Sequence, residues 1–153
     1  MRYCEATLSD SLLEMLIDLS VRWEDENCCH GYRATTRADI EGNRIFLARE
    51  EGQTIGYLFG HCFDSENMKS IMPEKSRCFE VEELYVLPEY RSKGIGRSLF
   101  FFVEQAMRPE AEYFVLGTAT KNWKAILHFY LDEIGMDFWS ARLFKRISEE
   151  SQC

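Results

Sequence analysis

The sequence predicts a single α/β domain of the α+β kind, built on one mixed, mostly antiparallel sheet flanked by helices. Its 153 residues suit one domain with one core. Apolar residues make up 46% and charged residues 29%, an ordinary globular balance. Strand patterns dominate the first half, and a strand-helix-strand-helix-strand unit follows. No repeat or linker divides the chain, so we place the domain at residues 1–150.

The first half shows the two periodicities that separate strands from helices. Alternating apolar residues predict strands, and leucines at helical spacing after Ser11 predict a helix that a Ser11–Glu14 capping box begins. The expected elements are a strand at 2–8, this helix, an irregular loop at 22–37, a short helix at 36–40, and a hairpin of strands at 43–50 and 54–63.

Proline and glycine mark the elements of the second half. Pro88 and Pro109 follow apolar runs, and Gly135 follows a helical pattern. The expected elements are a loop at 64–75, a strand at 77–86, a helix at 94–107, a strand at 111–117, a helix at 122–133, and a last strand at 137–147 packed through Phe138, Trp139 and Phe144.

Composition limits the function classes. A net charge of −8 argues weakly against nucleic acid and would favour a cationic small molecule. The apolar runs are too short to cross a membrane and the first residues lack a signal-peptide pattern, so we expect a cytoplasmic protein. The six cysteines are expected to be free thiols. Adjacent Cys and His residues would diverge, so we expect no metal site.

The segment 81–100, VEELYVLPEYRSKGIGRSLF, passes from a strand through a basic glycine turn into a helix. The first turn of a helix has unpaired N–H groups and the positive end of the helix dipole, so it can bind phosphate. Gly94 and Gly96 let a ligand approach the backbone, and Arg91, Lys93 and Arg97 add positive charge. This turn is therefore suited to a diphosphate, although two glycines alone are common in purely structural turns.

The glycine spacing distinguishes among phosphate-binding motifs. A P-loop pattern is absent, and Leu99 stands where a dinucleotide motif needs its third glycine. Arg91–Gly96 instead resembles the R/Q-x-x-G-x-G/A pattern of the GNAT superfamily of acyl-CoA-dependent N-acetyltransferases. Asn122–Ile126, with Tyr130 and Gly135, resembles the second signature of that superfamily, and the order of elements is also similar.

The chain departs from the superfamily pattern in two places. The spacings from Asn122 to Tyr130 and from Tyr130 to Gly135 are each one residue longer than usual. Either a bulge in the helix absorbs the extra residue, or Phe129 and Tyr130 are shifted around the helix. After Gly135 the chain has room for one strand where the superfamily usually has two, so the end of the sheet is expected to be simpler.

The resemblance implies a position for acetyl-CoA. The cofactor would lie in a V-shaped opening between the strand that ends at Val86 and the strand that ends near Gly117. Its pantetheine arm would pair with the strand like an added strand. The implied cofactor-binding residues are Leu84, Tyr85 and Val86 for the arm, Arg91, Ser92, Lys93, Gly94, Ile95, Gly96 and Arg97 for the diphosphate, and Asn122. Because many members of the superfamily are dimers, a homodimer is also implied.

The acceptor amine needs a base. An alkylammonium has a pKa of ~10.4, so forming the free amine at pH 7 costs about 4.6 kcal/mol. Glu80, Glu82 and Glu83 are the available carboxylates, and strand alternation puts Glu80 and Glu82 on one face and Glu83 on the other. By similarity to diamine acetyltransferases, Glu82 is the base and Glu83 faces the cationic substrate. Tyr130 would share its proton with the departing thiolate.

Three functions remain open at this level. The first is acetylation of a small cationic amine, for which Trp23, Glu24, Glu26 and Glu80 are the expected acceptor-binding residues through charge and cation–π contacts, although a solvated acidic loop is the commoner interpretation of 23–26. The second is acetylation of protein lysines or N-termini. The third is a non-catalytic acyl-CoA-binding module.

Overall fold

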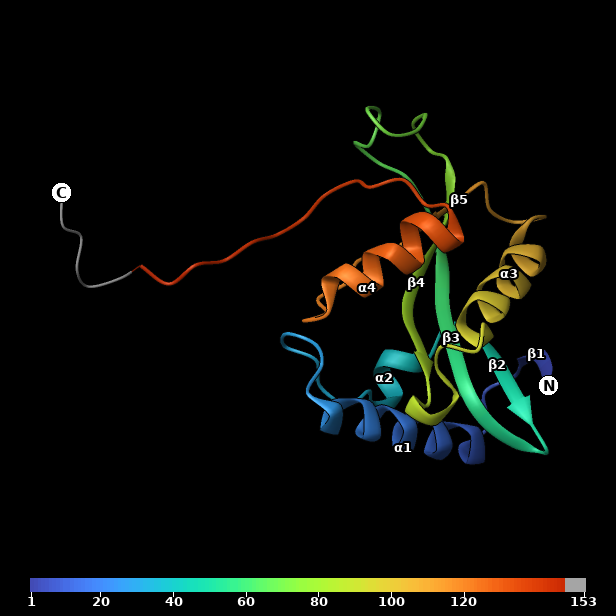
Figure 1. The fold of residues 1–153 in the computed structure, drawn as a ribbon. Coiled ribbons are helices and arrows are strands. Elements are labelled where there is room, and N and C mark those ends of the chain that lie inside the picture. Colours follow the sequence, from blue (N-terminus) through green and yellow to red (C-terminus); the bar gives the residue numbers. More distant parts are fainter. Residues whose placement is uncertain (148–153) are drawn as a thin grey trace.

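The computed structural model describes residues 1–147 and centres on a five-stranded sheet with the order β1-β2-β3-β4-β5 (Figure 1). The strands are β1 (Arg2–Ala6), β2 (Arg44–Glu50), β3 (Gln53–Asp64), β4 (Arg77–Val86) and β5 (Tyr113–Val115). Neighbours from β1 to β4 are antiparallel, and β5 is parallel to β4. The mixed, mostly antiparallel sheet is therefore confirmed, while 148–150 of the predicted domain lie outside the described residues.

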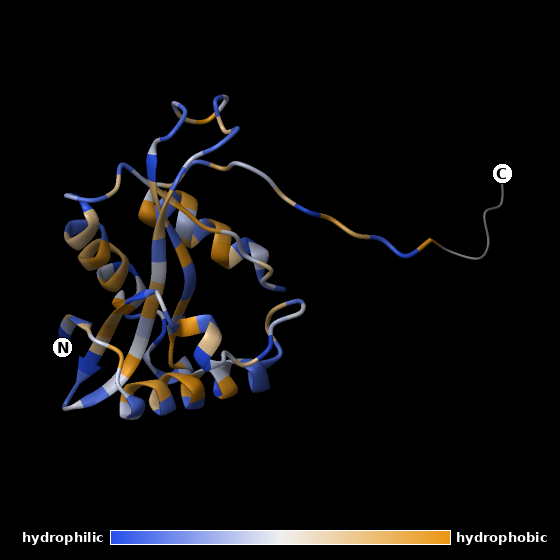
Figure 2. Cartoon of the chain, turned by 180° about the vertical axis from the view of Figure 1, so that it is seen from behind, coloured by the Kyte–Doolittle hydropathy of each residue, from blue (hydrophilic) through white to orange (hydrophobic). Residues whose placement is uncertain are grey.

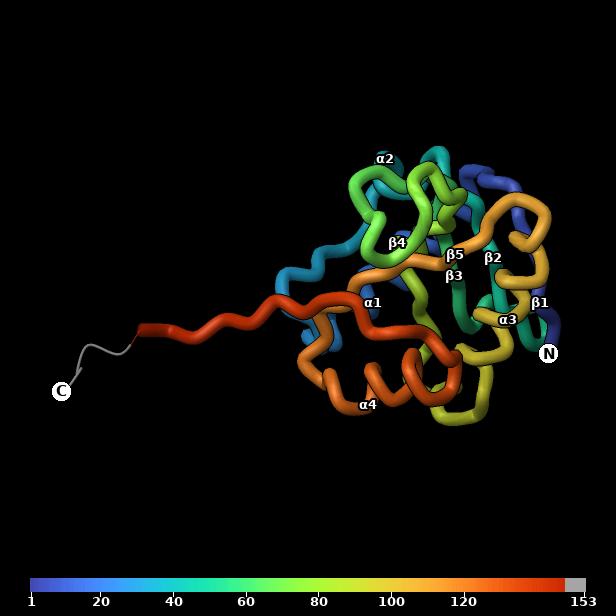
Figure 3. The backbone as a smooth tube through the Cα atoms, turned by 90° about the horizontal axis from the view of Figure 1, so that it is seen from above, coloured from blue at the N-terminus to red at the C-terminus, as the bar shows by residue number. Residues whose placement is uncertain are grey.

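Helices cover both faces of this sheet. They are α1 (Asp10–Glu26), α2 (Arg37–Ile40), the 3-10 turn η1 (Pro88–Tyr90), α3 (Ile95–Met107), α4 (Trp123–Leu127) and the π-helix η2 (His128–Ile134) that continues α4. Seen from above, α2 lies on one side of the sheet and α3 and α4 lie on the other (Figure 3). Among the described residues, no helix is long and apolar enough to cross a membrane.

Aromatic side chains from alternate strand positions form the core on each face of the sheet. Phe46 and Phe79 pack edge to face on the α3 side, where Phe100 of α3 joins Phe114. On the other face Tyr57 stacks on Phe59 and contacts Tyr85. Figure 2 shows the same alternation of apolar and hydrophilic residues along the helices that cover the sheet. Each fully buried large side chain contributes roughly 1.5–3 kcal/mol, so both helical layers are tied to the sheet.

Helix α1 differs from its prediction at both ends. Its N-cap is Ser9, whose hydroxyl accepts a hydrogen bond from the Leu12 amide at 3.2 Å, so the expected cap at Ser11 is wrong by two residues. The helix continues to Glu26 through a segment predicted to be an irregular loop. The Trp23 ring stacks on Tyr85 of β4 with a centroid distance of 5.2 Å, and this contact supports the added turn.

Strands β4 and β5 separate soon after they meet. Their ladder joins 78–80 to 113–115 only, so β5 is shorter than the predicted strand at 111–117. From Val81 onward, β4 has no ladder partner on the β5 side among the described residues. This divergence is the V-shaped opening expected from the sequence.

The predicted last strand at 137–147 is wrong for this chain taken alone. The segment is extended but forms no ladder, and it runs away from the sheet (Figure 1). Phe138, Trp139 and Phe144 were expected to pack against the sheet, yet they are 56%, 52% and 84% exposed. A strand needs a neighbour for its backbone hydrogen bonds, and within residues 1–147 this segment has none.

Candidate active site

The opening between β4 and β5 is the mouth of a cavity of about 1480 Å³. It is bounded by β4, the glycine turn, the start of α4 and the loop that follows α1. The predicted site residues that line it are Trp23, Glu82, Glu83, Leu84, Tyr85, Val86, Arg91, Ser92, Gly94, Ile95, Gly96, Arg97, Asn122 and Tyr130. The predicted residues outside the lining are Glu24, Glu26, Glu80 and Lys93.

The glycine turn presents the open end of a helix to this cavity. Ser92 and Gly94 have φ angles of 61° and 80°, and α3 begins at Ile95. No side chain caps this terminus, so its first N–H groups remain available together with the positive end of the helix dipole. A Cβ at Gly94 would meet no atom within 4 Å, so space remains beside the turn. The geometry suits a diphosphate.

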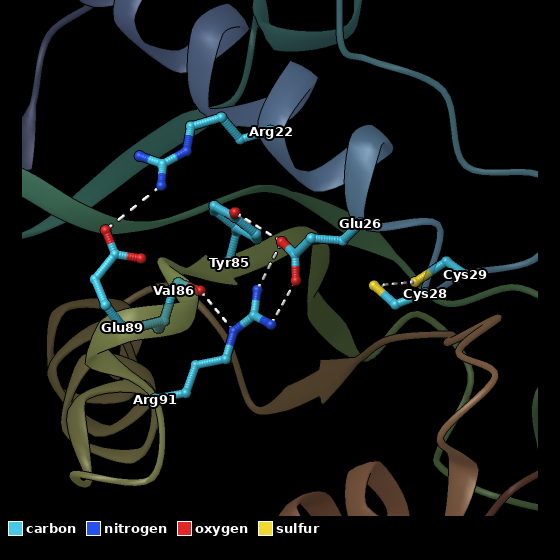
Figure 4. Close-up of polar contacts among 8 residues, drawn as sticks. All are labelled: Arg22, Glu26, Cys28, Cys29, Tyr85, Val86, Glu89 and Arg91. Atoms are coloured by element: carbon cyan, nitrogen blue, oxygen red, sulfur yellow. Dashed lines mark hydrogen bonds and ion pairs between the residues drawn. The ribbon is translucent and has the colours of Figure 1, made fainter.

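Arg91 makes contacts within the protein that the sequence did not predict. Its guanidinium binds the Glu26 carboxylate through two hydrogen bonds of 2.6 and 2.9 Å, and its Nε donates to the Val86 carbonyl at 2.8 Å (Figure 4). Glu26 also accepts from the Tyr85 hydroxyl at 2.8 Å. Arg91 and Glu26 therefore clamp the end of α1 to the β4–α3 turn. Lys93 and Arg97 are also exposed cations at the turn.

Glu24, a second acidic residue predicted to bind the acceptor, also has an internal partner. The Glu24 carboxylate accepts a hydrogen bond from the Ala34 amide in the loop after α1. Trp23 does face the cavity, although its ring is also packed against Tyr32 at a centroid distance of 4.3 Å. The acidic run at the end of α1 thus holds the loop and the turn in place.

A β-bulge places the carboxylates of β4. Phe59 of β3 pairs with Glu83, whereas the next residue, Gly60, pairs with Val81, so Glu82 is the extra residue. A Cβ at Gly60 would lie 2.1 Å from the Glu80 carbonyl oxygen. Only glycine allows the two backbones to approach this closely at the bulge.

The bulge brings the predicted catalytic acids to one face of the sheet. Glu82 lies 3.3 Å from His61 Nδ1, and Glu83 accepts a hydrogen bond of 2.7 Å from the Tyr57 hydroxyl. His61 and Tyr57 share a face of β3 because they are four residues apart in one strand. Glu80 also groups with His61 and Glu82. The expectation that Glu83 faces away from Glu80 and Glu82 is therefore wrong, because regular alternation stops at the bulge.

Two carboxylates of β4 line the cavity, and Glu83 is the more enclosed of them. Burial raises its pKa, while hydrogen bonds from Tyr57 and from Tyr32, the latter at 3.4 Å, act in the opposite direction. Burial and the neighbouring Glu83 charge raise the pKa of both tyrosines, so their hydroxyls stay protonated and continue to donate. Glu82 is more open, with 42% of its side chain exposed.

Tyr130 reaches the cavity from a π-helix. The helix that begins after Asn122 changes from α to π at His128, and Gly135 ends it with a φ of 87°. A π-turn accommodates one residue more than an α-turn, which explains the longer spacing on either side of Tyr130. Of the two alternatives, a bulge in the helix or a shift of Tyr130 around it, the structure shows the bulge. Burial, with a smaller contribution from Cys29, raises the pKa of Tyr130 to about 12, so its hydroxyl is protonated at neutral pH.

Residues that sequence reasoning missed come from the loop after α1 and from β3. Backbone hydrogen bonds of 2.8 Å join His30 to Ala119 and Lys121 to Cys28, so this loop closes the cavity against the segment that follows β5. Tyr32 enters the site from the same loop, and no local pattern marks it. His61 enters the site from β3. Gly60 within a strand pattern was the one available signal for the bulge beside it.

Comparison with known proteins agrees with this geometry. Residues 12–136 match the Acetyltransferase (GNAT) family. The fold is similar to an aminoglycoside N-acetyltransferase, AAC(6')-Iy, in complex with CoA, with a TM-score of 0.64, 17% identity, and coverage of 96% of this chain and 99% of that one. A ribosomal-protein-alanine N-acetyltransferase from Brucella melitensis biovar Abortus 2308 gives a TM-score of 0.67 at 16% identity, covering 95% and 100%. Comparison with curated proteins gave no sequence match.

The chain belongs to the GNAT family of acetyltransferases, since the family match covers most of its length. It is an acyltransferase that uses acetyl-CoA for N-acetylation. The cavity fits this cofactor: the uncapped start of α3 offers amides for the diphosphate, and the unladdered part of β4 offers backbone groups for the pantetheine arm. The residues that would hold it are Leu84, Tyr85 and Val86 on β4, the turn residues Ser92, Gly94, Ile95, Gly96 and Arg97, and Asn122.

Proposed function

We propose that this acetyltransferase transfers the acetyl group to a primary amine of a small cationic molecule by direct attack within a ternary complex. The observation that carries the proposal is the β-bulge, which turns Glu82 and Glu83 into the same cavity. Asp39 and Glu41 also line the cavity and add negative charge. Such a surface attracts an ammonium group and favours a substrate with more than one positive charge.

The two β4 carboxylates have different roles in this proposal. Glu82 accepts the proton from the ammonium, directly or through water, because its carboxylate is open to the cavity. Glu83 accepts hydrogen bonds from two tyrosine hydroxyls that fix the position of its carboxylate, so we assign it to orient the cation. Acetyl-CoA supplies the thioester carbonyl that the amine attacks.

Tyr130 donates a hydrogen bond at the opposite side of the reaction. Its hydroxyl is protonated at neutral pH because burial raises the pKa to about 12. A CoA thiol has a pKa near ~8.5, so the tyrosine stabilises the departing thiolate by a hydrogen bond, and complete proton transfer is uphill. The π-helix sets the position of this hydroxyl. The Arg91–Glu26 clamp acts indirectly, by positioning the glycine turn.

An amine panel with acetyl-CoA, followed by release of the CoA thiol, tests the substrate class. We expect turnover with di- and polyamines or aminoglycoside-like compounds, and little with neutral amines. The similar structures include both an aminoglycoside enzyme and a ribosomal-protein-alanine enzyme, so fold alone does not select the acceptor. Acetylation of protein lysines or N-termini, without turnover of any small amine, would contradict the proposal.

Two substitutions test the assigned chemistry. Glu82→Gln and Tyr130→Phe should each lower kcat by about 10²-fold or more, as is typical for removal of a proton-transfer group. The affinity for CoA, measured by calorimetry, should stay unchanged because neither side chain holds the cofactor. Glu66→Gln, in the exposed loop after β3, is the matched control. If Glu83→Gln abolished turnover and Glu82→Gln did not, the two roles would be reversed.

A further inference from the structure

His61 of β3 lines the cavity beside the proposed base Glu82. Its Nδ1 atom is 3.3 Å from a Glu82 carboxylate oxygen. Glu80 is its cross-strand neighbour on β4, and ligand atoms of these three side chains all lie within 4.8 Å of one another. A proton taken up by the imidazole would therefore face two negative charges.

Asn43, which follows α2, determines which ring nitrogen of His61 carries the proton. The Asn43 amide nitrogen donates to the backbone carbonyls of Asp39 and Ile40 at 2.8 and 3.2 Å. Its side-chain oxygen is thereby turned toward His61 and lies 3.3 Å from Nδ1. Because an amide oxygen can only accept a hydrogen bond, Nδ1 is the protonated nitrogen. The neutral ring keeps its lone pair on Nε2.

The Nε2 atom is available to accept a proton. Among the hydrogen bonds within residues 1–147, His61 takes part through Nδ1 only, and 40% of its side chain is exposed. Water in the cavity can therefore bring a proton to Nε2, and solvent can remove it afterwards. A histidine that is held at one ring nitrogen and open at the other is suited to proton transfer.

The basicities of the two groups set the direction in which a proton moves between them. The ordinary pKa is ~4.3 for a glutamic acid and ~6.5 for an imidazolium. A proton is therefore held about 10²-fold more tightly by an imidazole than by a carboxylate. Transfer from Glu82 to a neighbouring imidazole makes removal of the proton from an ammonium less unfavourable.

We propose that His61 is a proton-relay residue, which takes the proton of the acceptor ammonium from Glu82 and passes it to solvent. This inference rests on the proposed function, because it concerns the proton that the acceptor loses. The ammonium gives one proton to Glu82, and that proton moves through water to Nε2 of His61. Glu82 is then ionised again and lies beside the imidazolium. The second proton, lost when the amide forms, goes to the CoA thiolate, so one proton is released for each acetyl group transferred.

A conservative variant separates a proton relay from a packing role. His61→Asn places an amide N–H near the position of Nδ1, so the bond to Asn43 is retained, but the variant has no basic nitrogen. With spermidine as acceptor we expect kcat to fall about 10²-fold, while the KM for spermidine and the affinity for CoA change little. A His61→Asn variant with the kcat of the original chain would overturn the proposal.

Chemical rescue gives the second test. Added imidazole should restore turnover to His61→Ala, and a less basic halogenated imidazole should restore less of it. Acetylated spermidine is measured by mass spectrometry, because imidazole itself can react with a thioester and release the CoA thiol. Activity of His61→Ala that is low and that imidazole does not raise would show that the ring acts in another way, and the relay would be wrong.

His128 provides the matched control. It also lines the cavity, but its Nδ1 is 2.8 Å from the carboxylate of Asp132 in its own helix. His128→Ala should keep the kcat of the original chain and gain nothing from imidazole. Rescue of both variants to the same extent would contradict a specific role for His61.

The original chain separates the relay from the proposed function. If it acetylates spermidine and the His61 variants do so equally well, the relay fails and the proposed function stands. If it acetylates no small amine, the proposed function fails, and the relay fails with it.

Discussion

The carboxylate of Glu83 is buried among hydroxyl groups at the point where β4 bulges. Desolvation disfavours its charged form and raises its pKa, and the donors Tyr57 and Tyr32 recover only part of that loss. An acid placed in this way costs stability when it is ionised. A substrate ammonium group beside the Glu83 carboxylate would offset this cost in stability.

This burial predicts a pH-dependent effect of Glu83→Gln on stability. The pKa of Glu83 in the folded chain lies above its value in the unfolded chain, so the folded form binds the proton more tightly. The destabilising effect of the charge is therefore absent at low pH and appears as pH rises through that pKa. We expect the Tm of the variant relative to the original chain to become more favourable as pH rises from the ordinary pKa of a glutamate, ~4.3, through the higher pKa of Glu83 in the folded chain.

Calorimetry at several pH values measures this difference. Glu66→Gln, in an exposed loop, should show no comparable trend. If the Tm difference between Glu83→Gln and the original chain did not change with pH, the ionised carboxylate would be as well stabilised in the fold as in water.

Among single residues of the candidate site, sequence reasoning identified those that belong to a motif and missed those that do not. Tyr130 and Glu82 were identified because each resembles a position in a motif of the superfamily, and both line the cavity. Tyr32 contacts Glu83 from 51 positions away, and a loop without periodicity gives no indication of such a contact. Glu26 was expected to bind the acceptor amine, and its pairing with Arg91, 65 positions away, has no local signal in the sequence.

Among the elements, β4 has an irregular register at Glu82. Regular alternation would have pointed Glu82 and Glu83 to opposite faces, and the observed register turns both toward the cavity. The sequence does contain the cause of this irregularity. Gly60 stands inside an apolar strand pattern, where glycine signals a bulge or a close backbone approach.

Gly60→Ala is therefore expected to be strongly destabilising. Its Cβ would lie 2.1 Å from the Glu80 carbonyl oxygen, and backbone atoms cannot move aside as a flexible side chain can. We expect a loss of about 3 kcal/mol in the free energy of unfolding, at the upper end of the range for overpacking. Urea denaturation measures this loss, and Gly117→Ala is the matched control because its Cβ would meet no atom within 4 Å. Equal stability of the two variants would refute the role given to Gly60.

The C-terminal end of α1 shows why one predicted loop was wrong. Its last turn does not repeat the leucine spacing of the earlier turns, so the pattern indicates an end near Arg22. In the structure that turn is stabilised by aromatic stacking of Trp23 on Tyr85 and by the Glu26–Arg91 pair. Such contacts depend on the tertiary fold and leave no periodic signal.

Across the whole molecule, the order of the helices and strands followed from hydrophobic period and from proline and glycine positions. The opening between β4 and β5 was implied by the resemblance to the GNAT superfamily. The position of the segment 137–147 did not follow, although its strand pattern is clear. A pattern predicts that a segment can be a strand, but it does not say which sheet edge that strand joins.

The opening between β4 and β5 predicts where acetyl-CoA changes backbone protection. The β4 segment from Leu84 to Val86 lacks a ladder partner on the β5 side, and the first turn of α3 is uncapped. Backbone amides of this kind exchange with solvent easily until a ligand accepts their hydrogen bonds. Hydrogen-exchange mass spectrometry should show slower exchange at 84–86 and 92–97 when acetyl-CoA binds, and no change in the β1–β2 ladder. Protection confined to other segments would place the cofactor elsewhere, and the roles of Glu82 and Tyr130 depend on this position.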